Sequence, residues 1–339
     1  MNLRSQGWLV SFCFACSIFL ITSCGGGGGG DDGPTIPASY DGLTTQAAIT
    51  TANAEELVLG AWDGGLPADN AGDVISLATK SSVPDSSSPL VTDILKNTVL
   101  DLYSETQNNI HPLATASDTM AGDCGGTASF FLTVNEDNGS FTGKLTFTDY
   151  CSDGVVINGI TPFSGRASTS DGEIVYLKMI FDDLNAIDGT TSQTLTDGSI
   201  SFSLNSTRTI ETETINYVLV DDSLAKACWI NNYVLVFNLD TGSSTLTGRF
   251  YHPDYGYINI STLTPMTTSG TTLPTSGVLL FTGQTSQAKL TFNSDETTLL
   301  EVDDNNDGVF EEYGQVDLGF ISENITIIVD PPIEPPPEL

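Results

Sequence analysis

Short stretches in which apolar and polar residues alternate, separated by turn residues, dominate the chain after about residue 116. A side-chain period of two, bounded by Gly, Asn, Asp and Pro, is typical of half-buried strands. Besides one hairpin, the expected strands span residues 174–181, 199–204, 216–220, 232–239, 277–282 and 288–292. Strand after strand at such intervals predicts a mainly β fold, an antiparallel sandwich or barrel.

The clearest hairpin pairs residues 127–134 with residues 141–150 across an Asn-Glu-Asp-Asn-Gly turn. Asn, Asp and Gly tolerate the left-handed backbone that tight hairpin turns need. With the turn centred on its Asp-Asn pair, Phe130 lies opposite Leu145. A turn centred on the following Asn-Gly pair would shift this register.

The N-terminus carries an export signal. Arg4 precedes an apolar run at residues 8–21, which is shorter than the roughly 20 residues needed to cross a bilayer and is typical of a signal peptide. The run ends in Ile21, Thr22, Ser23 and Cys24. This tetrapeptide resembles the lipobox of bacterial lipoproteins, and the resemblance implies that Cys24 receives a diacylglyceryl group and becomes the first mature residue. The alternative is an ordinary secretory signal cleaved nearby.

A glycine run at residues 25–30 follows the lipobox. Gly-rich sequence forms a flexible coil, so residues 24–39 are expected to tether a folded body to the membrane. Gly25 differs from the aspartate that holds enteric lipoproteins at the inner membrane. We therefore expect an outer-membrane lipoprotein whose membrane contact is the lipid on Cys24, with residues 1–23 removed as the signal peptide.

Three cysteines remain beyond the lipobox, at positions 124, 151 and 228. Exported proteins reside in oxidising compartments, so one disulfide is expected. The hairpin register sets Cys124 opposite Cys151, and alternation then puts both sulfurs on the apolar face. The shifted turn would leave them diagonal neighbours. Cys228 is left over.

The charge balance is strongly acidic. Only Arg4 of the ten basic residues precedes Cys24, so the mature chain has nine basic and 43 acidic residues, a formal charge of −34. A basic groove for phosphates is not evident in the sequence, and nucleic acid is therefore not an expected partner. Apolar residues make up 39% of the chain, which is ample for a packed core.

Residues 40–115 carry helical patterns instead of strand patterns. Asn53 followed by Glu56 matches a capping pattern before an apolar stretch, and Ser88-Pro89 opens a second stretch with helical spacing. A small segment of two short helices is therefore expected before the β region.

A weak repeat divides the β region. The residues Cys124, Asn135, Asp137 and Gly139 recur about a hundred positions later as Cys228, Asn238, Asp240 and Gly242. Two duplicated β units, at residues 116–226 and 227–330, would explain this internal repeat. Chance similarity is the alternative, because hairpins share turn residues for physical reasons. The Pro-rich tail at 331–339 is expected to be extended.

The best candidate ligand site is an acidic loop within the second unit. Oxygen-bearing side chains at alternate positions suit Ca²⁺, and Gly308 permits a sharp turn. The expected ligands are the side chains of Asp303, Asn305, Asp307 and Glu311 with the carbonyl of Val309. This spacing resembles the loops of dockerins and thrombospondin type 3 repeats, although Gly314 stands where an EF-hand has its bidentate glutamate. The alternative is an acidic hairpin turn.

Catalytic patterns are weak. The histidines, His111 and His252, accompany no G-x-S-x-G or H-E-x-x-H motif, and the C-x-x-C of Cys13 and Cys16 lies in the signal peptide. Aromatic residues around His252 could form a sugar-stacking platform or simply pack at a strand edge. We expect a non-enzymatic binding or adhesion module for an unknown protein or glycan ligand. A calcium-stabilised structural envelope protein and an envelope hydrolase are the alternatives.

Overall fold

The computed structural model describes residues 34–65, 95–96, 98–100 and 114–316, apart from residues 136, 153, 190, 223–224, 268–273 and 296. Its elements are a helix and fourteen strands: α1 (Ala54–Gly65), β1 (Ala114–Ala121), β2 (Gly125–Asn135), β3 (Ser140–Ser152), β4 (Val155–Ala167), β5 (Ile174–Asp188), β6 (Thr191–Leu204), β7 (Ile210–Asp221), β8 (Lys226–Asn238), β9 (Ser243–His252), β10 (Gly256–Thr267), β11 (Ser276–Thr282), β12 (Gln287–Phe292), β13 (Thr298–Asp303) and β14 (Glu311–Gln315). Among the described residues, no helix has both the length and the apolar character to span a bilayer.

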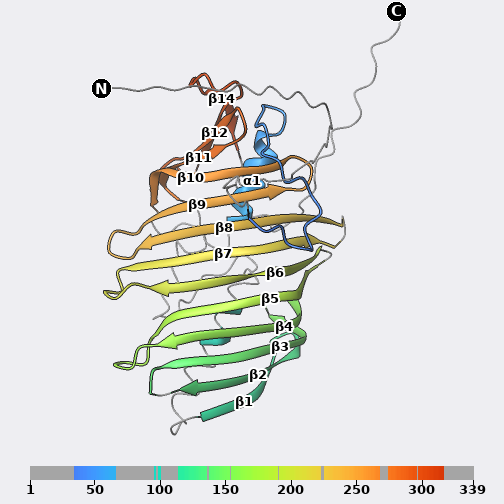
Figure 1. Cartoon of the computed structure of the whole chain (residues 1–339), viewed down its shortest axis with the longest axis vertical. Coiled ribbons are helices and arrows are strands. Elements are labelled where there is room, and N and C mark those ends of the chain that lie inside the picture. Colours follow the sequence, from blue (N-terminus) through green and yellow to red (C-terminus); the bar gives the residue numbers. More distant parts are fainter. Residues whose placement is uncertain are drawn as a thin grey trace, which may run out of the picture. The chain divides into compact units, whose positions relative to one another are not determined.

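The strands form one sheet in which each strand pairs antiparallel with the next along the chain (Figure 1). The expected mainly antiparallel β fold with a small helical element before it is therefore confirmed. In the part of the chain that the structure describes, the terminal strands β1 and β14 do not pair with each other, so the sheet is open and is not closed into a barrel.

One face of the sheet, called here the inner face, carries the main apolar core. Alternate residues of each strand are buried on it, as in the run Ala128, Phe130, Leu132 and Val134 of β2. The helix α1 covers part of this face, and its Trp62 ring lies 5.1 Å from the Phe292 ring, centroid to centroid. Burying each of the larger apolar side chains stabilises the fold by about 1.5–3 kcal/mol, so this face is the main source of stability.

A line of β-bulges crosses the sheet. Asp149 in β3, Asp183 in β5, Asp197 in β6 and Asn232 in β8 all have φ between 49° and 58°, in the left-handed region. In each of these strands the positions that belong to the main core change parity at the bulge, because one extra residue turns the following side chains to the other face. Alternation in the sequence therefore breaks in mid-strand.

The bulges explain why several expected strands are too short. The expected strand 174–181 stops just before Asp183, whereas β5 continues to Asp188. The expected strand 199–204 begins just after Asp197, whereas β6 begins at Thr191.

The helix α1 begins where the sequence predicts, but its cap differs. Asn53 Oδ1 accepts the N–H of Thr50 at 2.8 Å, and the Glu56 carboxylate contacts the sheet instead of the helix end. In the second expected helix, residues 95–96 and 98–100 are helical, and its remainder lies outside the described residues.

The first hairpin has the expected register, with Phe130 opposite Leu145. Beyond the Asp149 bulge the register shifts, so that Gly125 faces Cys151. Cys124 and Cys151 form a disulfide with their Cα atoms 5.1 Å apart. The expected placement of both sulfurs on the apolar face is wrong: Cys124 is exposed, and the bulge leaves Cys151 on the opposite face from Tyr150.

The two expected β units belong to the same continuous sheet, and their boundary falls at the start of β8. Their equivalent turns share one contact. Asn135 Oδ1 accepts the N–H of Asp137, and Asn238 Oδ1 accepts the N–H of Asp240, both at 3.0 Å. Because such contacts also form in unrelated turns, duplication stays a prediction.

Candidate functional site

The outer face of β2–β6, opposite the main core, gathers three basic side chains: Lys144 of β3, Arg166 of β4 and Lys178 of β5. They alternate with buried inner-face residues such as Leu145, Gly165 and Leu177, which fixes their outward direction. Lys144 and Arg166 are exposed and Lys178 is half-buried. We call the outward positions of β2–β6 around them the cationic face.

Strand register fixes the spacing of the three cations. Lys144 pairs with Pro162, Lys178 with Ser164 and Arg166 with Tyr176. With strands about 4.8 Å apart and a rise of about 3.3 Å per residue, the Cα atoms of the three cations are separated by about 8, 12 and 14 Å. The three positive charges therefore surround one small area of the sheet.

None of these three side chains forms a hydrogen bond or ion pair with the described residues. Asp182 is the single acidic residue at the outward positions of this area, and it lies at the edge of the area. The outward positions counted are those within residues 129–133, 140–146, 160–166, 176–182 and 199–203. The cationic face is thus locally positive on a chain of strongly negative total charge, and three of its nine post-lipobox basic residues gather there.

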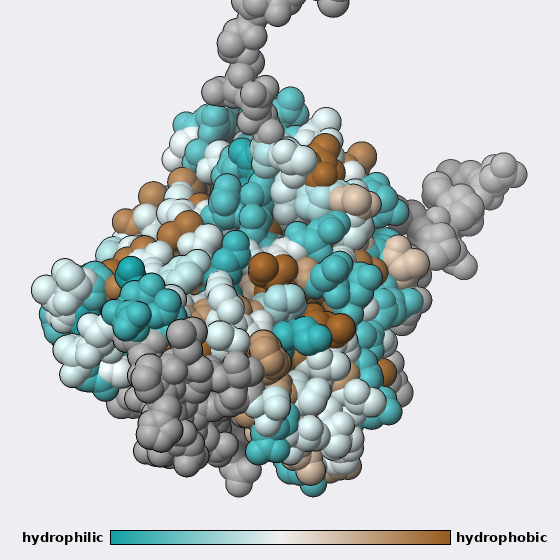
Figure 2. All heavy atoms as spheres, turned by 60° about the horizontal axis from the view of Figure 1, so that its bottom comes forward, coloured by the Kyte–Doolittle hydropathy of each residue, from teal (hydrophilic) through white to brown (hydrophobic). Residues whose placement is uncertain are grey.

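The remaining outward positions combine apolar and hydroxyl side chains. Phe131, Ile160 and Ile180 are 49%, 44% and 43% exposed, and serine and threonine fill most of the rest. In Figure 2, where the β1 end of the sheet is turned toward the viewer, small apolar groups lie among hydrophilic side chains. Such a surface offers apolar contact, hydroxyl hydrogen bonds and positive charge together.

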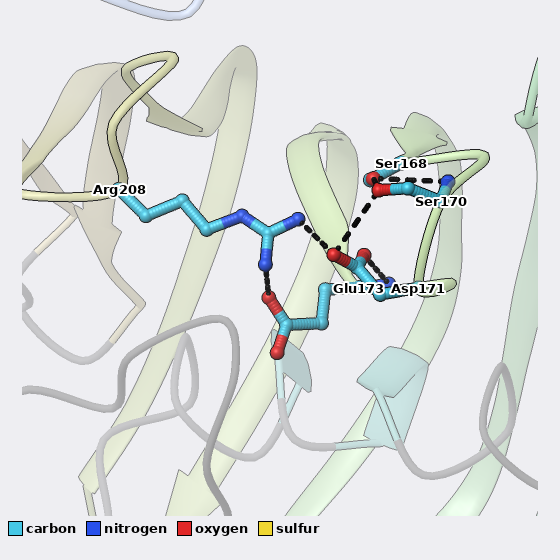
Figure 3. A network of polar contacts seen from close by, with 5 residues as sticks. All are labelled: Ser168, Ser170, Asp171, Glu173 and Arg208. Atoms are coloured by element: carbon cyan, nitrogen blue, oxygen red, sulfur yellow. Dashed lines mark hydrogen bonds and ion pairs between the residues drawn. The ribbon is translucent and has the colours of Figure 1, made fainter.

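A charged network lies at the end of the strands near Arg166. Arg208, in the turn between β6 and β7, contacts the carboxylates of Asp171 and Glu173 in the turn between β4 and β5 (Figure 3). The hydrogen bond from Arg208 lowers the pKa of Asp171 to about 2. Both carboxylates therefore form their ion pairs with Arg208 and not with the cations of the cationic face.

His252, one of the two histidines on which a catalytic triad would depend, joins α1 to the sheet. Its Nε2 lies 3.2 Å from Glu56 Oε1, and its Nδ1 accepts the N–H of Asp254 at 3.2 Å. Tyr255 donates its hydroxyl hydrogen bond to the other oxygen of Glu56 at 2.8 Å. Both imidazole nitrogens are thus occupied, and the arrangement leaves no free ring nitrogen for general-base catalysis. The other histidine, His111, lies outside the described residues.

The aromatic residues near His252 pack against each other instead of forming an exposed platform. Trp229 and Tyr251 stack with their ring centroids 4.2 Å apart, and each is 3% exposed. Tyr40, from the segment before α1, covers them and donates its hydroxyl to the carbonyls of Leu43 and His252. The sugar-stacking interpretation is therefore wrong for Tyr251, while Tyr255 and Tyr257 are half-buried and the interpretation stays a prediction for them.

The expected unpaired cysteine, Cys228, is a free thiol. Burial raises its pKa to about 12, with further contributions from Asp254 and Glu56. A thiol with this pKa stays protonated at neutral pH and is a poor nucleophile. Cys24 lies outside the described residues.

The acidic loop follows β13. Asp303 is buried, and its two carboxylate oxygens accept the N–H groups of Asp307 and Gly308 at 3.1 and 2.9 Å. Asn305 Oδ1 accepts the N–H of Asp307 at 2.9 Å. No group of three His, Cys, Asp or Glu side chains within the described ranges is arranged to hold a metal ion. Val309 and Glu311 are exposed, and the calcium site stays a prediction.

Sequence reasoning missed the cationic face. Local alternation predicts that each of these side chains points outward. It does not predict that the cations of β3, β4 and β5 lie close together, because that depends on strand order and register. Comparison of the chain with protein-family models, curated proteins and solved structures gives no match. The function is therefore argued from the residues and their geometry.

Proposed function

We propose that this protein is an exported lipoprotein, anchored through lipid on Cys24, that acts as a non-enzymatic binding module of the bacterial envelope. The observation that carries the binding role is the cationic face, where Lys144, Arg166 and Lys178 point outward and have no ion-pair partner among the described residues. Charged side chains that are clustered yet unpaired are available to an external ligand of opposite charge.

The envelope location is supported by the sequence before the fold. The lipobox-like tetrapeptide ending at Cys24 and the glycine run after it are the expected parts of a lipid anchor and a tether. The disulfide between Cys124 and Cys151 fits an oxidising compartment. An outer-membrane location is part of the same proposal.

A calcium-stabilised structural role is the second candidate. It is favoured by Asp303, whose buried carboxylate is already oriented by the backbone of its own loop. The two candidates are compatible, because the acidic loop belongs to β13–β14 and the cationic face to β2–β6. The envelope hydrolase has no observation of this kind in its favour. His252 already contacts Glu56, and the Cys228 thiol is protonated at neutral pH because its pKa is raised.

The anchoring is tested by expressing the full chain and the Cys24→Ser variant and separating membranes from soluble material. The proposal expects the wild-type protein in the membrane fraction, where it incorporates a labelled fatty acid. The Cys24→Ser variant should incorporate no label. Equal labelling of both proteins, or none of the wild type, would contradict lipid anchoring through Cys24.

A further inference from the structure

The cationic face has the chemistry of a receptor for an acidic polysaccharide. We infer that its ligand is a glycan chain bearing carboxylate groups, which would lie across β3, β4 and β5. This inference rests on the proposed binding role and names the ligand class for the same face.

Charge density argues for a glycan instead of a nucleic acid. The Cα atoms of Lys144, Arg166 and Lys178 are separated by about 8–14 Å, as expected from strand geometry. Duplex DNA carries a charge about every 1.7 Å, so most of its phosphates would have no cation and would be repelled by the acidic remainder of the protein. A polyuronate has fewer charges along its length, and single carboxylates can meet single cations.

The side chains between the cations suit sugar rings. Hydroxyls such as those of Thr142 and Ser201 can exchange hydrogen bonds with sugar hydroxyls, and the exposed ring of Phe131 offers an apolar surface for the C–H face of a sugar. A protein partner would require larger buried apolar anchors than these dispersed groups provide.

Salt should control the interaction. At physiological ionic strength the Debye length is about 8 Å, so the acidic residues elsewhere on the protein are largely screened from a bound carboxylate, whereas contacting cations are not. Binding should therefore occur at moderate salt and weaken as salt rises further.

The test uses the mature full-length lipoprotein in a neutral detergent. Its affinity is measured for a soluble polyuronate, for uncharged dextran and for a DNA duplex. The inference expects binding to the polyuronate in preference to the other two. Because a charge-assisted contact contributes about tenfold or more in affinity, the triple variant Lys144→Gln, Arg166→Gln, Lys178→Gln should bind at least about tenfold more weakly.

Two controls separate the site from general charge and from misfolding. The variant Lys226→Gln, Arg249→Gln, Lys289→Gln changes the net charge equally at positions outside the cationic face, and it should keep polyuronate affinity. Arg166→Lys keeps the charge and should bind within a few-fold of the wild type. Thermal unfolding of every variant verifies the fold. A loss of polyuronate affinity supports the inference only in a variant that is folded.

Several results would overturn the inference. One is a failure of the wild-type protein to bind polyuronate, and others are binding to dextran as tightly as to polyuronate or to DNA more tightly than to polyuronate. An equal loss of polyuronate affinity in the two triple variants would overturn the inference as well. Failure of the glycan experiment would leave the fractionation result for Cys24 untouched, so the ligand class and the lipid anchoring fail separately.

Discussion

At the scale of single residues, His252 shows how a titratable group can be structural. Burial lowers its pKa below the ordinary value of 6.5, against the opposing effect of Glu56. The contact of Nδ1 with the Asp254 N–H acts in the same direction, because a protonated Nδ1 could not accept that hydrogen bond. The neutral ring therefore bridges α1 and the β9–β10 turn.

The pH dependence of stability follows from this lowered pKa. The unfolded chain takes up the His252 proton first as pH falls, so stability is full above about 6.5 and declines as the pH falls through that value toward the lower folded pKa. We expect the thermal midpoint to fall between about pH 7.5 and 5.5. The His252→Gln variant, which keeps a donor for Glu56 but does not titrate, should show a smaller fall. An equal fall in both proteins would contradict this role.

At the scale of elements, the sequence predicts the kind of strand better than its length. Alternation identifies the inner faces and the first hairpin because each depends on neighbouring residues and turn chemistry. It fails at Asp183 and Asp197, where a bulge changes the parity within one strand. It also fails to reveal the cationic face, because no local pattern brings Lys144 beside Lys178.

The bulge in β3 can be tested at Asp149, which has φ of 49° and an exposed side chain. Glycine adopts this backbone freely, whereas a β-branched residue in the left-handed region is disfavoured by about 1–2 kcal/mol. We expect Asp149→Val to lower the free energy of unfolding, measured by urea denaturation, by about that amount relative to Asp149→Gly. Equal stability of the two variants would show that the position does not require a left-handed residue.

The acidic loop after β13 makes a prediction about calcium. If the loop binds the ion in the folded state alone, millimolar calcium must raise the thermal midpoint, and magnesium should raise it less. The Asp307→Ala variant should lose the calcium-specific rise, because it removes one of the expected ligands. A rise that persists in the variant would locate the effect elsewhere, and no rise in the wild type would make the loop an acidic turn.

At the scale of the whole molecule, an open antiparallel sheet separates two tasks. The inner face packs the core under α1, while the cations on the outer face of β2–β6 have no ion-pair partner in the part of the chain that the structure describes. This division leaves a broad surface that lies outside the main core. Such a surface can specialise for binding, and a flexible tether would let it reach a ligand away from the membrane.

The most direct test of the account is mass spectrometry of the N-terminal peptide of the protein purified from membranes. The account predicts that this peptide begins at Cys24 and carries the mass of a diacylglyceryl group on its sulfur. An unmodified N-terminus at another residue would contradict the lipoprotein assignment, on which the proposed place of the cationic face in the envelope depends.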